Sequence, residues 1–302
     1  MKNIGSHFVE ANGIRLHYLR GGSGRTLLLL HGWPEWSHVW RPVISRLADE
    51  FDLVAPDFRG FGDSQKTSLT PARDATPEAL AADMLALADG LGLGRIGLVA
   101  HDVGSFVGQV IARRSPQRVA GLFFFNCAYP GIGARWVEPR HLPEIWYQFF
   151  HQMPWAAELI GSSREACRVY IREFLRHWSY RKDAFDEELD LWVDNFMKPG
   201  NLQGGFNWYR SNHASRMAVI DGVAQTPPPI GIPTRVLWGR HDPVLKRSWT
   251  DRLPEFFTNL ELGFVPAGHF VHYEMPDRAS EEVRRFFRRV GSEGFFDNRS
   301  RG

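Results

Sequence analysis

Three residues far apart in the sequence have the types and surroundings of a nucleophile, an acid and a base. Asp102 is the centre of the segment 100–104, AHDVG, whose small end residues suit a sharp turn from a strand into a helix. A free aspartate has a pKa of about 3.9, and its ionised carboxylate needs no base to attack an electrophilic carbon. Asp242 and His269 each follow a short apolar run. A histidine whose tautomer is held by an aspartate can activate the water that hydrolyses the resulting ester.

The assignments of Asp102 and His269 have alternatives. Aspartate is also favoured as a helix N-cap, and taken alone Asp102 favours this capping role; the other residues of the constellation reverse that preference. His272 competes with His269 as the base, but Gly268 favours His269 because a loop histidine at a strand end can reach the turn. His101 is next to the nucleophile and cannot point the same way, so we expect a buried, hydrogen-bonded histidine there.

Short strand signals alternate with helical ones along the first 130 residues. Strands separated by helices predict right-handed crossovers and a mostly parallel sheet, mainly eight-stranded, with helices on both faces. Ligands bind such sheets beyond the carboxyl ends of the strands, where Asp102, Asp242 and His269 are expected. The strands are expected at 8–11, 14–19, 26–30, 53–55, 96–100, 121–125, 233–238 and 260–265, and helices at 39–48, 76–91, 105–114 and 279–290.

The middle of the chain has a different character. Residues 131–227 carry helical signals, no clear strand and six of the 11 tryptophans. We expect them to form a helical cap domain, or lid, inserted into an α/β core. The first part of the core is then 1–130 and the second part is 228–302, which ends in a frayed C-terminal tail.

The composition excludes several classes of protein. The chain has 302 residues, with 36 Lys and Arg against 34 Asp and Glu interspersed along it, which argues against a nucleic-acid-binding surface. Cys127 and Cys167 lack metal-ligand spacing and are expected to be small buried hydrophobes. The N-terminal segment MKNIGSHF lacks the features of a signal peptide, and the apolar runs are too short to insert into a membrane. We therefore expect a cytoplasmic protein.

Several motifs together carry a family resemblance. They are HGWP at 31–34, RGFGDS at 59–64, the turn around Asp102, GRHD at 239–242 and GH at 268–269. Over roughly residues 10–290 the chain resembles the α/β-hydrolase fold family and, within it, the epoxide hydrolases. Their Asp-nucleophile branch is related to haloalkane and fluoroacetate dehalogenases. The chain order of nucleophile, acid and histidine matches the family's order. The resemblance also implies a cis bond between Trp33 and Pro34.

The resemblance also assigns proton donors for opening an epoxide ring. The segments WYQFF at 146–150 and FNWYR at 206–210 resemble those that carry the two lid tyrosines of epoxide hydrolases, which makes Tyr147 and Tyr209 the expected ring-opening acids. By the same resemblance, the backbone N–H groups of Trp33 and Val103 form the oxyanion hole. Packing is the alternative role for a tyrosine in an aromatic-rich lid.

The expected reaction is the addition of water to an epoxide to give a vicinal diol, through an ester on Asp102. The alternatives are a haloalkane-type dehalogenase and a non-catalytic hydrolase-fold binding protein. Val103 argues against the dehalogenase because it has no side-chain N–H to bind a halide, although many epoxide hydrolases have Trp there. We expect no cofactor and no metal, a small apolar epoxide and water as partners, and a monomer or homodimer. Judged by position alone, the substrate pocket is lined by Trp33, Trp36, Phe150, Trp155 and Phe270.

Overall fold

The fold is organised around one twisted sheet. A computed structural model describes residues 4–66 and 74–296, so the end of the expected C-terminal tail lies outside the described residues. The sheet has eight strands in the order β1-β2-β4-β3-β5-β6-β7-β8. They are β1 (Gly5–Ala11), β2 (Ile14–Gly22), β3 (Arg25–Leu30), β4 (Phe51–Pro56), β5 (Ile96–His101), β6 (Val119–Phe125), β7 (Thr234–Gly239) and β8 (Leu260–Val265).

The directions of the strands agree with the sequence pattern. β1 and β2 form an antiparallel hairpin across Asn12 and Gly13, whose φ angles of 52° and 74° are those of a tight two-residue turn. β2 also pairs antiparallel with β4, and the strands from β4 across to β8 pair in parallel. β4, β5 and β6 are buried along their whole length, as expected for parallel strands covered on both faces. The expected mostly parallel sheet is confirmed.

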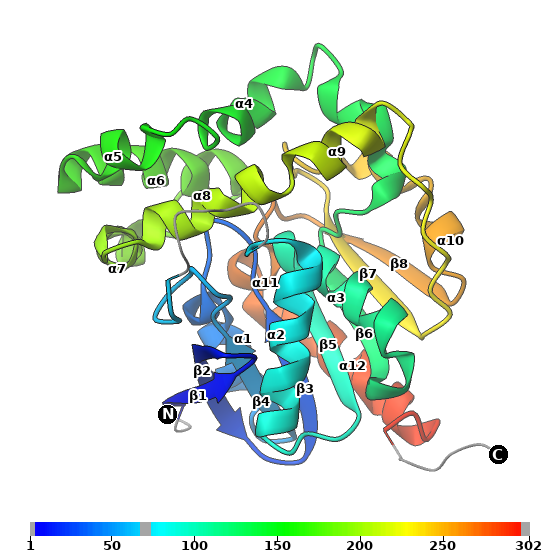
Figure 1. The fold of residues 1–302 in the computed structure, drawn as a ribbon. Helices are drawn as coiled ribbons and strands as arrows, with labels where there is room; N and C mark the ends of the chain where they lie inside the picture. The colour runs from blue at the N-terminus through cyan, green and yellow to red at the C-terminus, as the bar shows by residue number, and fades with distance from the viewer. Residues whose placement is uncertain (1–3, 67–73, 297–302) are drawn as a thin grey trace.

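Helices cover both faces of the sheet (Figure 1). α2 (Pro77–Gly90) packs against α3 (Val103–Arg114) on one face, and α1 (Arg41–Leu47) packs against α12 (Pro276–Ser292) on the other. Thr76 caps α2 as the sequence indicates, because its side chain accepts a hydrogen bond from the N–H of Ala79 at 3.2 Å. The remaining helices outside the cap region are η1 (Ser37–Trp40), η2 (Pro116–Arg118), η5 (Arg247–Thr250), α10 (Leu253–Phe256) and α11 (Val271–Glu274).

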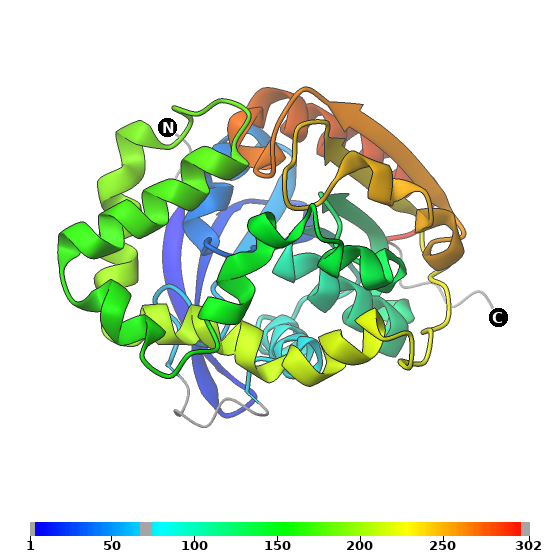
Figure 2. The ribbon, with the colours of Figure 1, turned by 90° about the horizontal axis from the view of Figure 1, so that it is seen from above.

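Between β6 and β7 the chain leaves the sheet. Helices cross above the carboxyl ends of the strands and enclose the space over them on several sides (Figures 1 and 2). The division into a core of 1–130 and 228–302 and a cap of 131–227 remains a proposal. These helices are η3 (Pro130–Val137), α4 (Leu142–Phe150), α5 (Ala156–Gly161), α6 (Arg164–Trp178), η4 (Asp186–Glu188), α7 (Leu189–Met197), α8 (Asn201–Ser211) and α9 (His213–Ile220).

Among the described residues, no helix is both long enough and apolar enough to cross a membrane.

Candidate active site

The turn between β5 and α3 holds Asp102 in a strained backbone conformation. Its φ of 47° and ψ of −113° lie where residues other than glycine are rare. The turn packs so closely that a Cβ atom on Gly104 would lie 2.3 Å from the carbonyl oxygen of Leu30. The Asp102 side chain does not cap α3. Instead, its Oδ1 accepts a hydrogen bond from the backbone N–H of Trp33 at 3.1 Å, so the turn presents this carboxylate rather than using it as a cap.

His269 lies between two carboxylates. Its Nδ1 is 2.7 Å from Oδ2 of Asp242, and its Nε2 is 3.9 Å from Oδ2 of Asp102. Burial alone would lower the pKa of His269, but the charge of Asp242, the hydrogen bond to it and the charge of Asp102 together raise it to about 9. The structure therefore brings together the three residues expected as nucleophile, acid and base.

Asn126 is a part of this arrangement that no sequence motif marks. It follows β6 with a φ of 43°. Its Nδ2 donates to Oδ2 of Asp242 at 2.5 Å and to the carbonyl oxygens of Gly268 and His269, each at 3.1 Å. Its Oδ1 accepts from the N–H of Gly239 at 2.7 Å. One buried side chain thus connects the loop that carries the acid to the loop that carries the base. Its position after a strand was the only signal in the sequence.

The two expected tyrosines meet although they come from different helices. Tyr147 on α4 and Tyr209 on α8 are both buried, with ring centroids 5.5 Å apart and ring planes nearly perpendicular. The side-chain amide of Gln148 donates to the Tyr147 hydroxyl at 2.9 Å. Burial, with the negative charge of Asp102 adding to it, raises the pKa of both phenols. Both hydroxyls therefore stay protonated at neutral pH.

A cavity of about 440 Å³ adjoins these groups. It extends along α3 from Asp102 to Arg113 and Arg114, with α9 on its other side. Besides Asp102, its lining includes Val103, Phe106, Val110, Trp208, Tyr147 and Tyr209.

The structure does not place any of the five aromatic residues predicted for the substrate pocket along this cavity. Trp33, Trp36 and Phe270 are buried against other aromatic rings. Phe150 packs against Trp155, which is 51% exposed. Large aromatic side chains between the sheet and the helices above it fill the core rather than border the void. Trp33 still contributes to the site through its backbone N–H, and Val103, the other expected oxyanion donor, is the first residue of α3.

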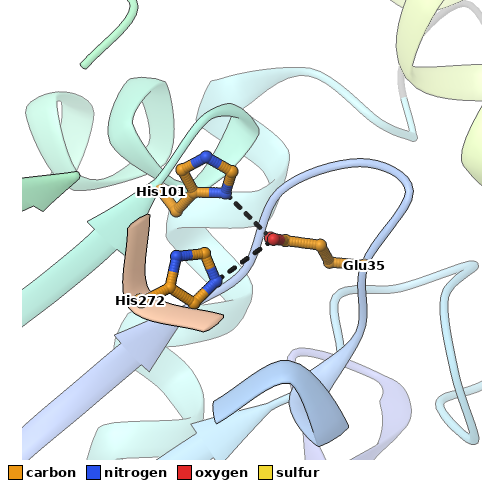
Figure 3. Close-up of side chains that lie close together, drawn as sticks. All are labelled: Glu35, His101 and His272. Carbon is orange, nitrogen blue, oxygen red and sulfur yellow. Dashed lines mark hydrogen bonds and ion pairs between the residues drawn. The ribbon is translucent and has the colours of Figure 1, made fainter. Parts of the chain in front are cut away.

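Glu35, His101 and His272 form a buried group (Figure 3). The ring of His101 lies next to that of His269, with centroids 4.5 Å apart. Oε2 of Glu35 is 3.0 Å from Nδ1 of His101, and its Oε1 is 3.1 Å from Nε2 of His272. Burial would raise the pKa of Glu35, but the two histidines hold it well below its usual range. His101 also contacts the carbonyl oxygen of His269 at 3.0 Å through Nε2. His272 is thus paired with Glu35, whereas His269 is paired with Asp242.

Two groups of described residues bring together side chains that can bind a metal. The ligand atoms of Glu35, His101 and His272 lie within 4.8 Å of one another. The same holds for His17, Asp57 and Asp63, where Nδ1 of His17 is 2.8 Å from Oδ2 of Asp57. Hydrogen bonds and ion pairs within each group account for its close spacing.

Comparisons with known proteins agree with the fold. Residues 25–165 match the family described as alpha/beta hydrolase fold. The chain is 32% identical to a soluble epoxide hydrolase of Corynebacterium sp. (strain C12), covering 94% of this chain and 97% of that protein. The solved structure of epoxide hydrolase CorEH without ligand matches with a TM-score of 0.83 at 30% identity, covering 95% of this chain and all of that one. A more distant relative, 27% identical over 93% of this chain and 87% of its own length, is a cis-3-alkyl-4-alkyloxetan-2-one decarboxylase of Shewanella oneidensis. The chain belongs to the epoxide hydrolase family of the α/β-hydrolase fold.

Proposed function

We propose that this protein hydrolyses epoxides to vicinal diols through a covalent ester on Asp102. The observation that carries the proposal is that one cavity is bordered by a carboxylate at a strained turn and by two protonated phenols, Tyr147 and Tyr209. A nucleophile that needs no base, facing two acids, suits a reaction in which a carbon is attacked while the oxygen bound to it takes up a proton.

In the first step, an oxygen of Asp102 attacks one carbon of the epoxide ring. The carbon–oxygen bond of the ring breaks, its electron pair stays on the oxygen, and a tyrosine hydroxyl transfers a proton to that oxygen. The buried phenols bind the oxygen as charge develops on it, where two preorganised donors stabilise the transition state most. The phenolate left behind is later reprotonated from solvent.

In the second step, His269 removes a proton from water. The raised pKa of His269 means that the free enzyme holds it as an imidazolium. Esterification removes the negative charge of Asp102, so the pKa of His269 falls and its proton is released to solvent. The neutral imidazole then deprotonates a water, which attacks the ester carbonyl. The N–H groups of Trp33 and Val103 stabilise the oxyanion. When it collapses, the bond between the ester carbon and the substrate oxygen breaks, and the leaving alkoxide takes a proton from the His269 imidazolium to give the diol. The carboxylic acid formed on Asp102 then gives its proton to His269, which restores the carboxylate and the imidazolium of the free enzyme.

Trapping the ester tests this mechanism. A His269→Gln variant keeps the nucleophile but lacks the base, so exposure to an epoxide is expected to add the mass of the epoxide to the protein. Intact-mass spectrometry measures the adduct, and peptide mapping places it on Asp102. The control is Asp102→Asn, which is expected to form neither adduct nor diol. Diol formation by Asp102→Asn at the wild-type rate would contradict the proposal.

Dehalogenation is the competing reaction for the same nucleophile. A panel of alkyl and aryl epoxides and haloalkanes, scored for diol and for free halide, separates the two reactions. Diol without halide is expected, because the groups beside Asp102 include two phenols, and Val103 offers no side-chain N–H to a halide. A cis-3,4-dialkyl oxetan-2-one belongs in the panel as well, since one relative is named for such a substrate. Halide release without epoxide turnover would favour the dehalogenase.

A further inference from the structure

We propose that the preferred epoxide carries a carboxylate and that Arg216 binds it. This inference rests on the proposed function and adds the chemical class of the substrate to it. It departs from the expectation of an entirely apolar epoxide, and it depends on how one arginine of the cavity wall is surrounded.

Arg216 is a largely enclosed cation that pairs with no carboxylate of the described residues. It lies on α9 and lines the same cavity as Asp102, Tyr147 and Tyr209. Its Nη2 is buried and has no hydrogen-bond partner, and no salt bridge joins Arg216 to a carboxylate within residues 4–66 and 74–296. Its guanidinium lies over the ring of Trp136, with Cζ 5.0 Å from the ring centroid. Stacking on Trp136 holds the guanidinium in place, while its Nη2 donates no hydrogen bond to the protein.

Two other arginines whose side chains are largely buried, Arg59 and Arg235, are each paired with a carboxylate. Arg59 binds Asp83 through Nε at 2.6 Å and Nη2 at 2.5 Å, and Arg235 binds Glu282 at 3.0 Å. A buried guanidinium without such a partner is costly because it loses its hydration and gains no compensating charge. Burial accordingly lowers the pKa of Arg216, and the titratable groups that oppose this effect are two protonated phenols, Tyr147 and Tyr209. A ligand carboxylate supplies the missing charge and can accept two parallel N–H bonds from the fork of the guanidinium.

The position of Arg216 limits the distance between the carboxylate and the epoxide. Arg216 is seven residues beyond Tyr209 along the consecutive helices α8 and α9, and it lines the cavity together with both tyrosines, whose charges act on it, so it belongs to the end of the cavity that holds the phenols. A second arginine, Arg113, also has a buried, unpartnered Nη2, but its Nε donates to the carbonyl oxygen of Pro228 at 2.9 Å. Arg113 is 11 residues beyond Asp102 on α3, a separation of about 16 Å along the helix. Binding at Arg216 therefore requires a short spacer between carboxylate and ring, whereas binding at Arg113 would require a long one.

The test compares epoxy acids with their methyl esters, which are similar in shape but uncharged. Wild type is expected to have a kcat/KM at least tenfold higher for a short-spacer epoxy acid than for its ester. Arg216→Met keeps most of the apolar stem and removes the charge, and it is expected to lower this acid-to-ester ratio at least tenfold, mainly through a higher KM for the acid. Arg113→Met is the matched control, with a ratio expected to stay within about twofold of wild type.

A binding measurement separates recognition from chemistry. The saturated carboxylic acid of the same chain length cannot alkylate Asp102, and it is expected to inhibit wild type at least tenfold more strongly than it inhibits Arg216→Met. Thermal unfolding of each variant shows whether it is folded. Two results would overturn the inference. One is an Arg216→Met variant whose kcat/KM falls equally for acid and ester. The other is a fall of the acid-to-ester ratio in Arg113→Met rather than in Arg216→Met. If wild type hydrolysed the ester as well as the acid, only the inference about Arg216 would fail. If it formed no diol from either substrate, the proposed epoxide hydrolysis would fail as well.

Discussion

Asp102 and Asp242 have the same side chain, and their different hydrogen bonds suit them to the different roles proposed for them. Both oxygens of Asp242 are engaged: Oδ1 accepts from the N–H groups of Val244 and Leu245, at 2.8 and 2.9 Å, while Oδ2 binds Asn126 and His269. Asp102 is 21% exposed at its side chain, and one backbone N–H, that of Trp33, donates to it. Oδ2 of Asp102 accepts no hydrogen bond from the described residues and is available to attack a substrate. Both oxygens of Asp242 already accept hydrogen bonds, which suits this carboxylate to holding His269 in place.

This difference predicts how the pKa of His269 responds to each aspartate. In wild type it is about 9, and Asp242→Asn is expected to lower it most, because the charge and the hydrogen bond both come from that residue. Asp102→Asn, which imitates the neutral ester, is expected to lower it by a smaller amount. NMR titration of the His269 imidazole measures both effects. An unchanged pKa in Asp102→Asn would contradict the proposal that alkylation makes His269 a base.

At the scale of elements, the site depends on how closely α3 can approach β3. The backbone of Gly104 passes so near to the end of β3 that an added Cβ would meet the carbonyl oxygens of Leu30 and His31 at 2.3 and 2.8 Å. Neither oxygen can move without disturbing the sheet. Gly108, one turn further along α3, would place its Cβ 3.1 Å from a side-chain carbon of Phe124. A side chain can rotate away, so the two glycines are predicted to differ.

Gly104→Ala is therefore expected to destabilise the protein by about 3 kcal/mol or more and to abolish turnover by displacing Asp102. Gly108→Ala is the matched control, and a change of about 1 kcal/mol or less is expected, because alanine also favours the helix. Urea unfolding and diol formation measure the two effects. If Gly104→Ala were as stable and as active as Gly108→Ala, the close approach of α3 to β3 would not be what positions the nucleophile.

The sequence predicts these elements better than it predicts the cavity. Buried parallel strands are apolar runs bounded by polar or turn residues, so the strands expected at 96–100 and 260–265 agree with β5 and β8 to within one residue. Asn126 and Arg216 belong to no motif. Folding gives Asn126 its hydrogen-bond partners on two loops, and it leaves the guanidinium of Arg216 without a carboxylate partner among the described residues. The five aromatic residues assigned to the pocket show the same limit, because residue type does not distinguish a ring that fills the core from one that borders a void.

At the scale of the whole molecule, several buried histidines make the free energy of unfolding depend on pH in the acid range. Burial lowers the pKa of His31, and it lowers those of His141 and His272 to about 4 and that of His151 well below its usual value. In the unfolded chain these groups titrate near 6.5, so the unfolded state binds more protons as the pH falls. Their contribution to stability is therefore present above about pH 6.5 and is lost towards pH 4. The raised pKa of His269 acts at higher pH, since its contribution is lost as the pH rises through about 9.

His141 offers the cleanest test of this acid sensitivity, because neither of its ring nitrogens has a hydrogen-bond partner among the described residues. Its ring lies against Trp249, with centroids 4.6 Å apart, where a phenyl ring can take its place. The free energy of unfolding of wild type, from urea titrations, is expected to fall steadily between pH 6.5 and 4.5. His141→Phe is expected to recover about 2 kcal/mol of that loss, since its ring cannot be protonated in either state.

The control is the exposed His7, replaced by phenylalanine in the same way, which should leave the dependence of the unfolding free energy on pH unchanged. A slope in His141→Phe equal to that of wild type would show that protonation of this histidine does not drive unfolding in acid.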